Sequence, residues 1–466
     1  MHPNPTTYDP EPPTLPEGFL LGIADSDLQV IGEDHCLEKE GSQRTMWYRF
    51  AEQSGRVFQD ATPGVGVDRY HRWEEDAELI AHLGFRHYRT SLSWSRILTE
   101  EGEINAKAVA WYRRYFEALR AKGIKVYATL YHWELPDYLS QRGGWKNRAT
   151  AEAFVQHAEA CTRELGDLVE EIFILNEPWC AAHNSYFHGT HAPGEGNLRD
   201  TLIASHHLLL AQAMAFERIK EIAPSLPVGT VLNVEPSFPA TDENKDFTAA
   251  RLADQFFNGW FLDPIYRGQY PEELADRYGA KMPDFSSEDM SRIQIGASLS
   301  TMGLNYYTSK NVQGCDFSPL GYIPAREIDE EINGLGWSVF VPPVYPPGLQ
   351  LGLIDFHRRY EKDGMNRIMI TENGFAGHGT RDGSIEPLDD PRRIRYHQEH
   401  LKQILAAREA GVPVEGYFAW TLLDNYEWAE GYRPESCFGL VHVDRQSLAR
   451  TLKASAKWFQ RLNQAT

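Results

Sequence analysis

The chain has 466 residues, a length that allows two or three domains or one large α/β barrel around an extensive core. Its formal net charge is −20, from 46 basic and 66 acidic residues, which opposes any general affinity for nucleic acid or for an anionic membrane surface. The five cysteines are an odd number and form no CxxC pair, so the sequence predicts neither a disulfide framework nor a zinc site.

The first residues are polar and rich in proline, and they lack the basic start and apolar stretch of a secretory signal. No uninterrupted apolar run elsewhere approaches the length that crosses a membrane. We therefore expect a flexible N-terminal arm over residues 1–16, one folded domain over 17–466, and a reducing, cytoplasmic location. The sequence leaves the oligomeric state open, with a homo-oligomer as one option.

Eight short apolar runs, rich in β-branched and aromatic residues, recur along the chain and are typical of strands. They span residues 19–24, 85–94, 125–133, 170–178, 227–233, 300–309, 367–374 and 414–424. Amphipathic stretches with apolar residues at helical spacing lie between them, at 111–123, 150–166, 200–222 and 391–411. Gly123, Gly166 and Gly411 each close such a stretch, where a left-handed C-terminal residue is expected.

Strands that alternate with helices in this way predict a parallel sheet, and eight units favour closure into a barrel over an open, doubly wound sheet. No G-x-G-x-x-G follows the first strand, which counts against a dinucleotide fold. The expected fold is therefore α/β, a single (β/α)8 TIM barrel. Residues 224–300 and 310–360, which are rich in Pro, Gly and aromatic residues, would be enlarged βα loops.

In such a barrel the active site is built at the C-terminal ends of the strands. The polar and aromatic residues at or after these ends are Arg89, Trp94, His132, Trp133, Asn176, Glu177, Asn305, Tyr307, Glu372, Trp420, Glu427 and Trp428. Each has a structural interpretation by itself, since such a histidine is usually hydrogen-bonded, a tryptophan is usually core, and the arginine could form an ion pair. Their presence on one rim favours a functional site.

Two of these residues are carboxylic acids that directly follow or end apolar strands. Glu177 comes after the apolar run 173–175, and Glu372 comes after a second apolar run, 368–370. A pair of carboxyl groups can cleave a glycosidic bond if one is protonated and the other ionised, so their environments must separate their pKa values. Metal-assisted hydrolysis is the rival chemistry, but HExxH spacings are absent, and no metal or cofactor is implied.

Seven motifs in one order resemble the retaining β-glycosidases of glycoside hydrolase family 1, from about Phe19 to Leu462. They are FLLGIADSDLQ, YRTSLSWSRI, TLYHWELPDYL, ILNEPW, GLNYYT, ITENG and WTLLDNYEWAEGY. The resemblance implies double displacement, with Glu177 as the general acid/base and Glu372 as the nucleophile. For a retaining pair the carboxyl groups should stand about 5–5.5 Å apart.

The resemblance also implies roles for the other rim residues. Asn176 would hold the sugar 2-hydroxyl, while Arg89 and Tyr307 would keep Glu372 ionised and aligned. The residues implied to bind the substrate are Gln29, His132, Trp133, Asn305, Trp337, Trp420, Glu427 and Trp428. Family members that act on 6-phosphorylated sugars carry a different residue at the position of Trp428. At this position the chain resembles the members that act on neutral sugars.

The chain departs from the family pattern at its first strand and in two loops. ADSDLQVIG has Asp25 where the family usually has Thr, and strand spacing would place Asp25, Asp27 and Gln29 on one face. The two aspartates could lie near the sugar or could cap or pair with a basic residue. The loops at 337–349 and 432–438 are longer than the common form and would border the rim.

The main functional hypothesis is an exo-acting, retaining β-glycosidase of neutral β-D-glycosides or oligosaccharides, with glucosides, galactosides or fucosides as substrates. A transglycosylase with the same two glutamates is an alternative, because an acceptor hydroxyl can replace water. A non-catalytic sugar-binding barrel is a third, although both glutamates are retained.

Overall fold

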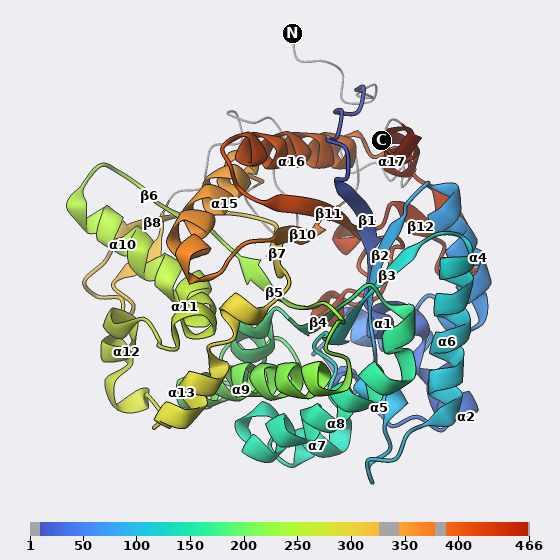
Figure 1. Ribbon diagram of the computed structural model, residues 1–466, viewed down its shortest axis with the longest axis horizontal. Helices are drawn as coiled ribbons and strands as arrows, with labels where there is room; N and C mark the ends of the chain where they lie inside the picture. The colour runs from blue at the N-terminus through green and yellow to red at the C-terminus, as the bar shows by residue number, and fades with distance from the viewer. Residues whose placement is uncertain (1–9, 326–343, 378–387, 465–466) are drawn as a thin grey trace.

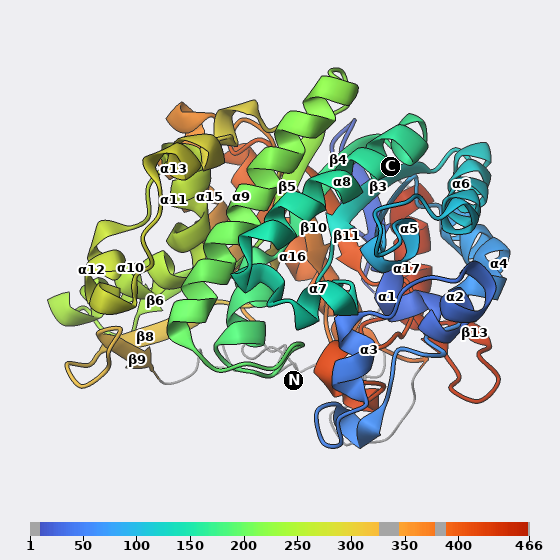
Figure 2. The same ribbon diagram turned by 90° about the horizontal axis from the view of Figure 1, so that it is seen from below.

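A computed structural model describes residues 10–325, 344–377 and 388–464 of the chain. Parallel strands form a closed barrel at the centre, and helices surround it on all sides (Figure 1 and Figure 2). The described part of the chain contributes eight strands to this barrel, in the order β1-β11-β10-β7-β5-β4-β3-β2. The predicted fold class, a (β/α)8 barrel, is confirmed.

The barrel strands coincide with the eight predicted runs. Seven are shorter than their runs, and β5 has the predicted length but is shifted by one residue. Their bounds are β1 Leu20–Ala24, β2 His87–Ser91, β3 Lys125–Tyr131, β4 Glu171–Asn176, β5 Val228–Val234, β7 Met302–Tyr306, β10 Ile368–Asn373 and β11 Val414–Trp420. Every neighbouring pair is parallel.

The helices that cover the barrel include all four predicted ones. They are α4 Arg69–His82, α6 Ala106–Ala121, α8 Arg148–Leu165, α9 Leu198–Ile222, α15 Pro346–Tyr360, α16 Pro391–Glu409 and α17 Ala454–Gln464. Three of them begin earlier than their apolar pattern predicts, because the side chains of Asn105, Asn147 and Asn197 cap their first turns. Each such cap stabilises a helix by about 1 kcal/mol.

Two of the three predicted helix-closing glycines are left-handed. Gly123 has φ 74° and Gly411 has φ 95°. The prediction for Gly166 is wrong, since its φ is −61° and its N–H bonds to Thr162. The chain continues there into a 3₁₀ turn, Gly166–Leu168, so the helix needs no left-handed residue to end.

The long segments after β5 and β7 carry secondary structure of their own. A three-stranded sheet forms from β6 Ser237–Pro239, β8 Lys310–Gly314 and β9 Tyr322–Pro324. In the described part of these segments, four helices accompany it: α10 Asn244–Asp254, α11 Trp260–Arg267, α12 Glu272–Tyr278 and α13 Ser287–Ile293. They lie together beside the barrel, at the left of Figure 1.

The inside of the barrel is filled by large side chains from β3, β4, β10 and β11. Tyr127, Phe173, Met369 and Phe418 are buried and form one apolar cluster with Trp420. The Tyr127 ring stacks on Phe173 and meets Phe418 edge-on. These packed side chains fill the barrel interior, as is usual for this fold, in which sites lie at the C-terminal rim.

The first described residues run along the helices near the C-terminus. The carbonyl oxygens of Pro10 and Glu11 accept hydrogen bonds from Trp458 and Gln398, on α17 and α16. Leu15 is buried. In the described residues, no helix combines the length and the apolar character that crossing a membrane would require.

The segment after β1 differs from the sequence expectation. β1 ends at Ala24, and a short helix, α1 (Asp27–Ile31), follows, so Asp25, Asp27 and Gln29 do not alternate along one strand face. That prediction is wrong because a helix, with a period of 3.6 residues, replaces the strand. The two aspartates instead form buried ion pairs.

Asp25 sits in a dense polar cluster under the segment. It accepts hydrogen bonds from Arg69 Nη1 at 2.6 Å, from the Tyr88 hydroxyl at 2.7 Å and from the Thr90 hydroxyl at 2.8 Å. Asp27 pairs with Arg96 at 2.9 Å. Of the two roles left open for these aspartates, pairing with a basic residue is the one seen.

We expect the Asp25→Asn variant to unfold more easily, by about 3 kcal/mol, because it leaves the buried Arg69 with one carboxylate fewer. The free energy of unfolding from denaturant titration would measure this. Glu78→Gln is the matched control, since the exposed Glu78–Lys122 pair should contribute less than about 1 kcal/mol. Unchanged stability with a weakened affinity for substrate would show instead that Asp25 serves the sugar.

Candidate functional site

The two glutamates predicted from the sequence lie at the C-terminal rim of the barrel. Glu177 directly follows β4, and Glu372 lies within β10, paired in register with Asn305 of β7. The strand register shifts beside both residues, between Phe173 and Asn176 and between Ile370 and Glu372. Such irregularities redirect side chains, and here they accompany two carboxyl groups that turn into one pocket.

Three non-glycine residues at this rim have left-handed backbone conformations. The φ angles are 66° for Trp133, 51° for Glu177 and 48° for Trp428. This region disfavours residues with a Cβ and costs on the order of 1–3 kcal/mol each unless the surrounding structure holds it. Strain concentrated at a pocket is typical of a functional site.

Glu372 is held by a cation and a phenol. Arg89 Nη1 donates to Oε1 at 2.7 Å, and the Tyr307 hydroxyl donates to Oε2 at 2.8 Å. Arg89 is fully buried, and only 3% of Glu372 is exposed. Both carboxylate oxygens are therefore fixed in direction, and both contacts favour the ionised form.

Asn176 and Asn305 connect the two glutamates. Arg89 Nη2 donates to Asn176 Oδ1 at 2.6 Å, and Asn305 Nδ2 donates to Glu177 Oε1 at 2.6 Å. Asn305 itself is oriented by the Thr371 hydroxyl, which donates to its Oδ1 at 2.7 Å. In this network Glu177 accepts a hydrogen bond from a neutral amide, whereas Glu372 accepts one from the positively charged Arg89.

Electrostatics separate the two carboxyl groups further. Burial, followed by the charge of Glu372, raises the pKa of Glu177 to about 8. Burial also raises the pKa of Glu372, but the charge and hydrogen bond of Arg89 and the hydrogen bond of Tyr307 oppose it. Of the pair, Glu372 is therefore the group that ionises first, and Glu177 is the group that keeps its proton.

The pocket around these groups has a volume of about 200 Å³. An apolar cavity of about 150 Å³ holds benzene, so this volume suits one six-membered ring. Its wall combines both glutamates with flat rings from His132, Trp133 and Trp428. The His132 ring stacks against Trp428, with centroids 5.9 Å apart.

Two polar side chains of the pocket wall, His132 and Glu427, could form hydrogen bonds with a ligand. Burial lowers the pKa of His132 far below its usual value, so the imidazole is neutral. Its Nδ1 has no hydrogen-bond partner among the described residues. Burial, then the charge of Glu372, raises the pKa of Glu427, whose carboxyl accepts from Gln29 Nε2 at 3.3 Å.

Most predicted site residues line the pocket. These are His132, Trp133, Glu177, Asn305, Tyr307, Glu372, Trp420, Glu427 and Trp428. Arg89, Asn176 and Gln29 lie behind this wall and orient its members through hydrogen bonds. Trp337 and most of the 337–349 loop lie outside the described residues.

Sequence reasoning missed the residues that line the rest of the pocket. They are Cys180, Asn184, His191, Asn233, Val234, Glu235, Phe257, Thr308 and Phe438. Asn233 lies at the end of the fifth barrel strand, so the rule that found the other strand ends could have found it. Phe438, at the end of the 432–438 loop, packs edge-on to Tyr307 and places that loop at the pocket.

The whole chain is similar to characterised glycosidases. The family model described as Glycosyl hydrolase family 1 matches residues 11–466. A beta-glucosidase of Agrobacterium sp. is 39% identical, over 96% of this chain and 95% of its own length. Beta-glucosidase A of Thermotoga maritima is 36% identical, over 96% of both chains.

Solved structures agree with these sequence matches. The family 1 β-glucosidase from Thermotoga maritima in complex with isofagomine lactam has a TM-score of 0.88 and 35% identity, and the match covers 97% of this chain and 99% of that one. The virulence factor SghA, in complex with its substrate analogue salicin, has a TM-score of 0.89 and 38% identity, over 97% and 96% of the two chains. The chain therefore belongs to glycosyl hydrolase family 1, and it is a glycoside hydrolase.

Proposed function

We propose that this glycoside hydrolase is a retaining exo-β-glucosidase, with Glu177 as the general acid/base and Glu372 as the nucleophile. The observation that carries the proposal is the unequal environment of the two carboxyl groups in one pocket. Glu372 is paired with the charged Arg89 and with Tyr307, whereas the hydrogen-bond partners of Glu177 are neutral, the Asn305 amide and the Cys180 thiol. One group is thus prepared to attack and the other to donate a proton.

In the first step, a carboxylate oxygen of Glu372 attacks the anomeric carbon and forms a glycosyl ester. The bond from that carbon to the leaving oxygen breaks, and Glu177 gives its proton to this oxygen. In the second step, the Glu177 carboxylate removes a proton from water as the water oxygen attacks the same carbon and Glu372 leaves. Two inversions retain the anomeric configuration, and this requires carboxyl groups about 5–5.5 Å apart.

Several side chains in and behind the pocket wall are placed to contact a bound sugar. Asn176, held between Arg89 and His132, would bind the 2-hydroxyl. His132 and Glu427 would bind further hydroxyls, with Gln29 orienting Glu427 from behind the wall, and the rings of Trp133, Trp420 and Trp428 would pack on the flat sugar face.

A neutral glycone fits this pocket better than a phosphorylated one. Four carboxyl groups, from Glu177, Glu235, Glu372 and Glu427, line its wall, and a sugar phosphate would add a further negative charge beside them. The relatives are named as beta-glucosidases, and the SghA complex holds salicin, so both support glucose as the glycone. β-Galactosides and β-fucosides are further candidate substrates.

The proposed cellular setting is a reducing one, the cytoplasm. All five cysteines are free in the structure, and Cys36 and Cys161 are buried. Burial raises the pKa of both thiols, which makes them poor partners for disulfide exchange.

Initial rates on nitrophenyl α- and β-glycosides of glucose, galactose, fucose, xylose, mannose and 6-phosphoglucose would test the proposal. We expect turnover of the neutral β-glucoside with retained configuration, and loss of activity in Glu372→Gln. Glu177→Gln should lose about 10²–10⁴-fold on substrates with poor leaving groups and less on activated ones. The control, Glu78→Gln, should keep full activity.

The products decide between hydrolysis and transfer in the same assay. If an added alcohol or sugar takes most of the glycosyl groups at low concentration, the protein is a transglycosylase. A well-folded protein that binds glucosides without turnover would contradict both activities and indicate a sugar-binding barrel.

The pH profile should show an alkaline limb set by Glu177. Its carboxyl donates a proton in the first step, so activity should fall as pH rises through its pKa, which burial and Glu372 raise to about 8. In Glu372→Gln, one source of that rise is removed, and the pKa of Glu177 should be lower. Carbon-13 NMR titration of labelled glutamate would measure both values, and identical titrations in the two proteins would contradict this electrostatic coupling.

A further inference from the structure

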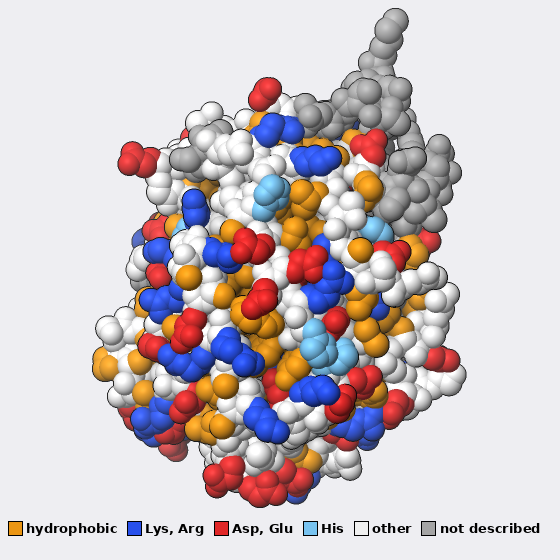
Figure 3. Space-filling view, turned by 90° about the vertical axis from the view of Figure 1, so that its right-hand side faces the viewer, with side chains coloured by type: hydrophobic (Ala, Val, Ile, Leu, Met, Phe, Trp, Pro, Cys, Tyr) orange, Lys and Arg blue, Asp and Glu red, His pale blue; other side chains and the backbone are white. Residues whose placement is uncertain are grey.

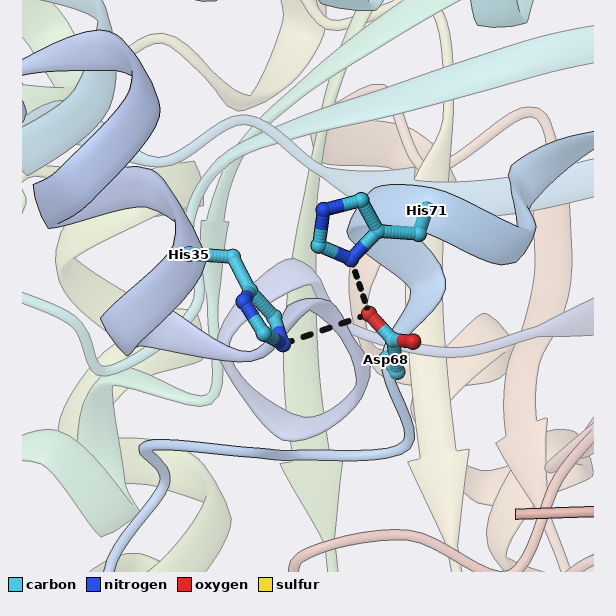
Figure 4. A group of neighbouring side chains, drawn as sticks. All are labelled: His35, Asp68 and His71. Atoms are coloured by element: carbon cyan, nitrogen blue, oxygen red, sulfur yellow. Dashed lines mark hydrogen bonds and ion pairs between the residues drawn. The ribbon is translucent and has the colours of Figure 1, made fainter. Parts of the chain in front are cut away.

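A second cluster of ligand-type side chains lies away from the pocket, where α2 (Glu33–Glu40) meets the start of α4. His35, Asp68 and His71 point toward one another there (Figure 4). Among the described residues, these three side chains form the group of His, Cys, Asp or Glu whose ligand atoms lie close enough together to bind one metal ion. The proposed glycosidase reaction uses none of them.

Both imidazoles face the same carboxylate oxygen. His35 Nε2 lies 3.3 Å from Asp68 Oδ1, and His71 Nδ1 lies 2.7 Å from it. All three donor atoms lie within 4.8 Å of one another. In tetrahedral zinc sites, metal bonds of about 2.0–2.2 Å separate the ligand atoms by about 3.4 Å. The cluster needs only side-chain shifts to open around one ion.

The backbone prearranges these side chains. Glu33 N–H bonds to Pro63 and Asp34 N–H bonds to Gly64, so the chain before α4 is fixed to the first turn of α2. Asp68 has a left-handed backbone, with φ 56°, at the N-cap of α4. Its own N–H bonds to Val65, which fixes the position of the carboxylate between the helices.

The cluster is accessible and carries a suitable charge. The exposed fractions of the side chains are 27% for His35, 19% for Asp68 and 47% for His71. Figure 3 shows this side of the molecule, with histidine rings at the surface among acidic and basic groups. Glu38 lies within electrostatic reach of both imidazoles and adds negative charge nearby.

We propose that His35, Asp68 and His71 form a surface site for one divalent transition-metal ion, with zinc as its natural class of occupant. Two imidazoles and a carboxylate suit zinc, cobalt, nickel and copper, whereas calcium and magnesium prefer oxygen ligands throughout. Solvent would supply the fourth ligand on the exposed side of His71. Each imidazole binds as the neutral tautomer whose ligating nitrogen carries no proton.

The site would act as a clamp between two elements. His35 belongs to α2, which follows α1 directly after Gly32, and the other two ligands belong to the start of α4. An ion bound there stabilises the folded chain by mass action, because the three ligands converge only after folding. The effect is on stability and requires no step of the glycosidase reaction.

Calorimetric titration of ZnCl₂ into the chelator-treated full-length protein tests the site. We expect one equivalent to bind and to raise the melting temperature. Cobalt(II) should bind at the same site and give the visible absorption of a four-coordinate ion, which added zinc should remove. Calcium should cause neither effect. Absence of zinc binding by the wild-type protein would overturn the proposal.

Variants assign the binding to these residues. His71→Asn and Asp68→Asn should each weaken zinc binding by at least about tenfold, since even second-shell partners contribute about 10–100-fold. Asn tolerates the left-handed backbone of residue 68, so that variant should fold. His357→Asn is the matched control, because His357 faces a single carboxylate, Glu361, at 3.9 Å. Equal affinity in His71→Asn and the wild type would contradict the assignment.

Discussion

The buried ion pair between Arg89 and Glu372 organises the rim of the barrel. Its cation comes from β2 and its anion from β10, and the same guanidinium also reaches Asn176 on β4. A charge removed from water must be compensated by such contacts, or it costs several kcal/mol. Three strands far apart in sequence are therefore held at fixed positions by one arginine, and the pocket is arranged around it.

The same pair explains how two chemically identical side chains acquire different properties. Glu372 is compensated, so it can carry the charge, and that charge then disfavours ionisation of Glu177. Asn305 contacts Glu177 without adding charge. The difference in proton affinity is thus a consequence of where one arginine lies, and it exists before any substrate binds.

The segment between β1 and α4 shows how the pocket is supported from outside. Gln29 contacts Glu427 from α1, and two buried ion pairs, Asp25 with Arg69 and Asp27 with Arg96, fix the backbone at the start of that helix. Neither aspartate lines the pocket. Both aspartates are buried and neutralised by arginines outside the pocket. The proposed metal site would stabilise the next part of the same segment, where α2 meets α4.

The sequence by itself determined the eight strands, the four main helices and most of the residues at the strand ends, because apolar periodicity and strand polarity are local properties. The shared strand face of Asp25, Asp27 and Gln29 and the left-handed conformation of Gly166 were wrong predictions, since α1 and a 3₁₀ turn, set by neighbouring contacts, replaced the expected conformations. Only the tertiary structure decided which oxygen of Glu372 meets Arg89, and that Phe257 and Phe438 reach the pocket. Those contacts join residues from different strands and loops, and closure of the barrel alone brings them together.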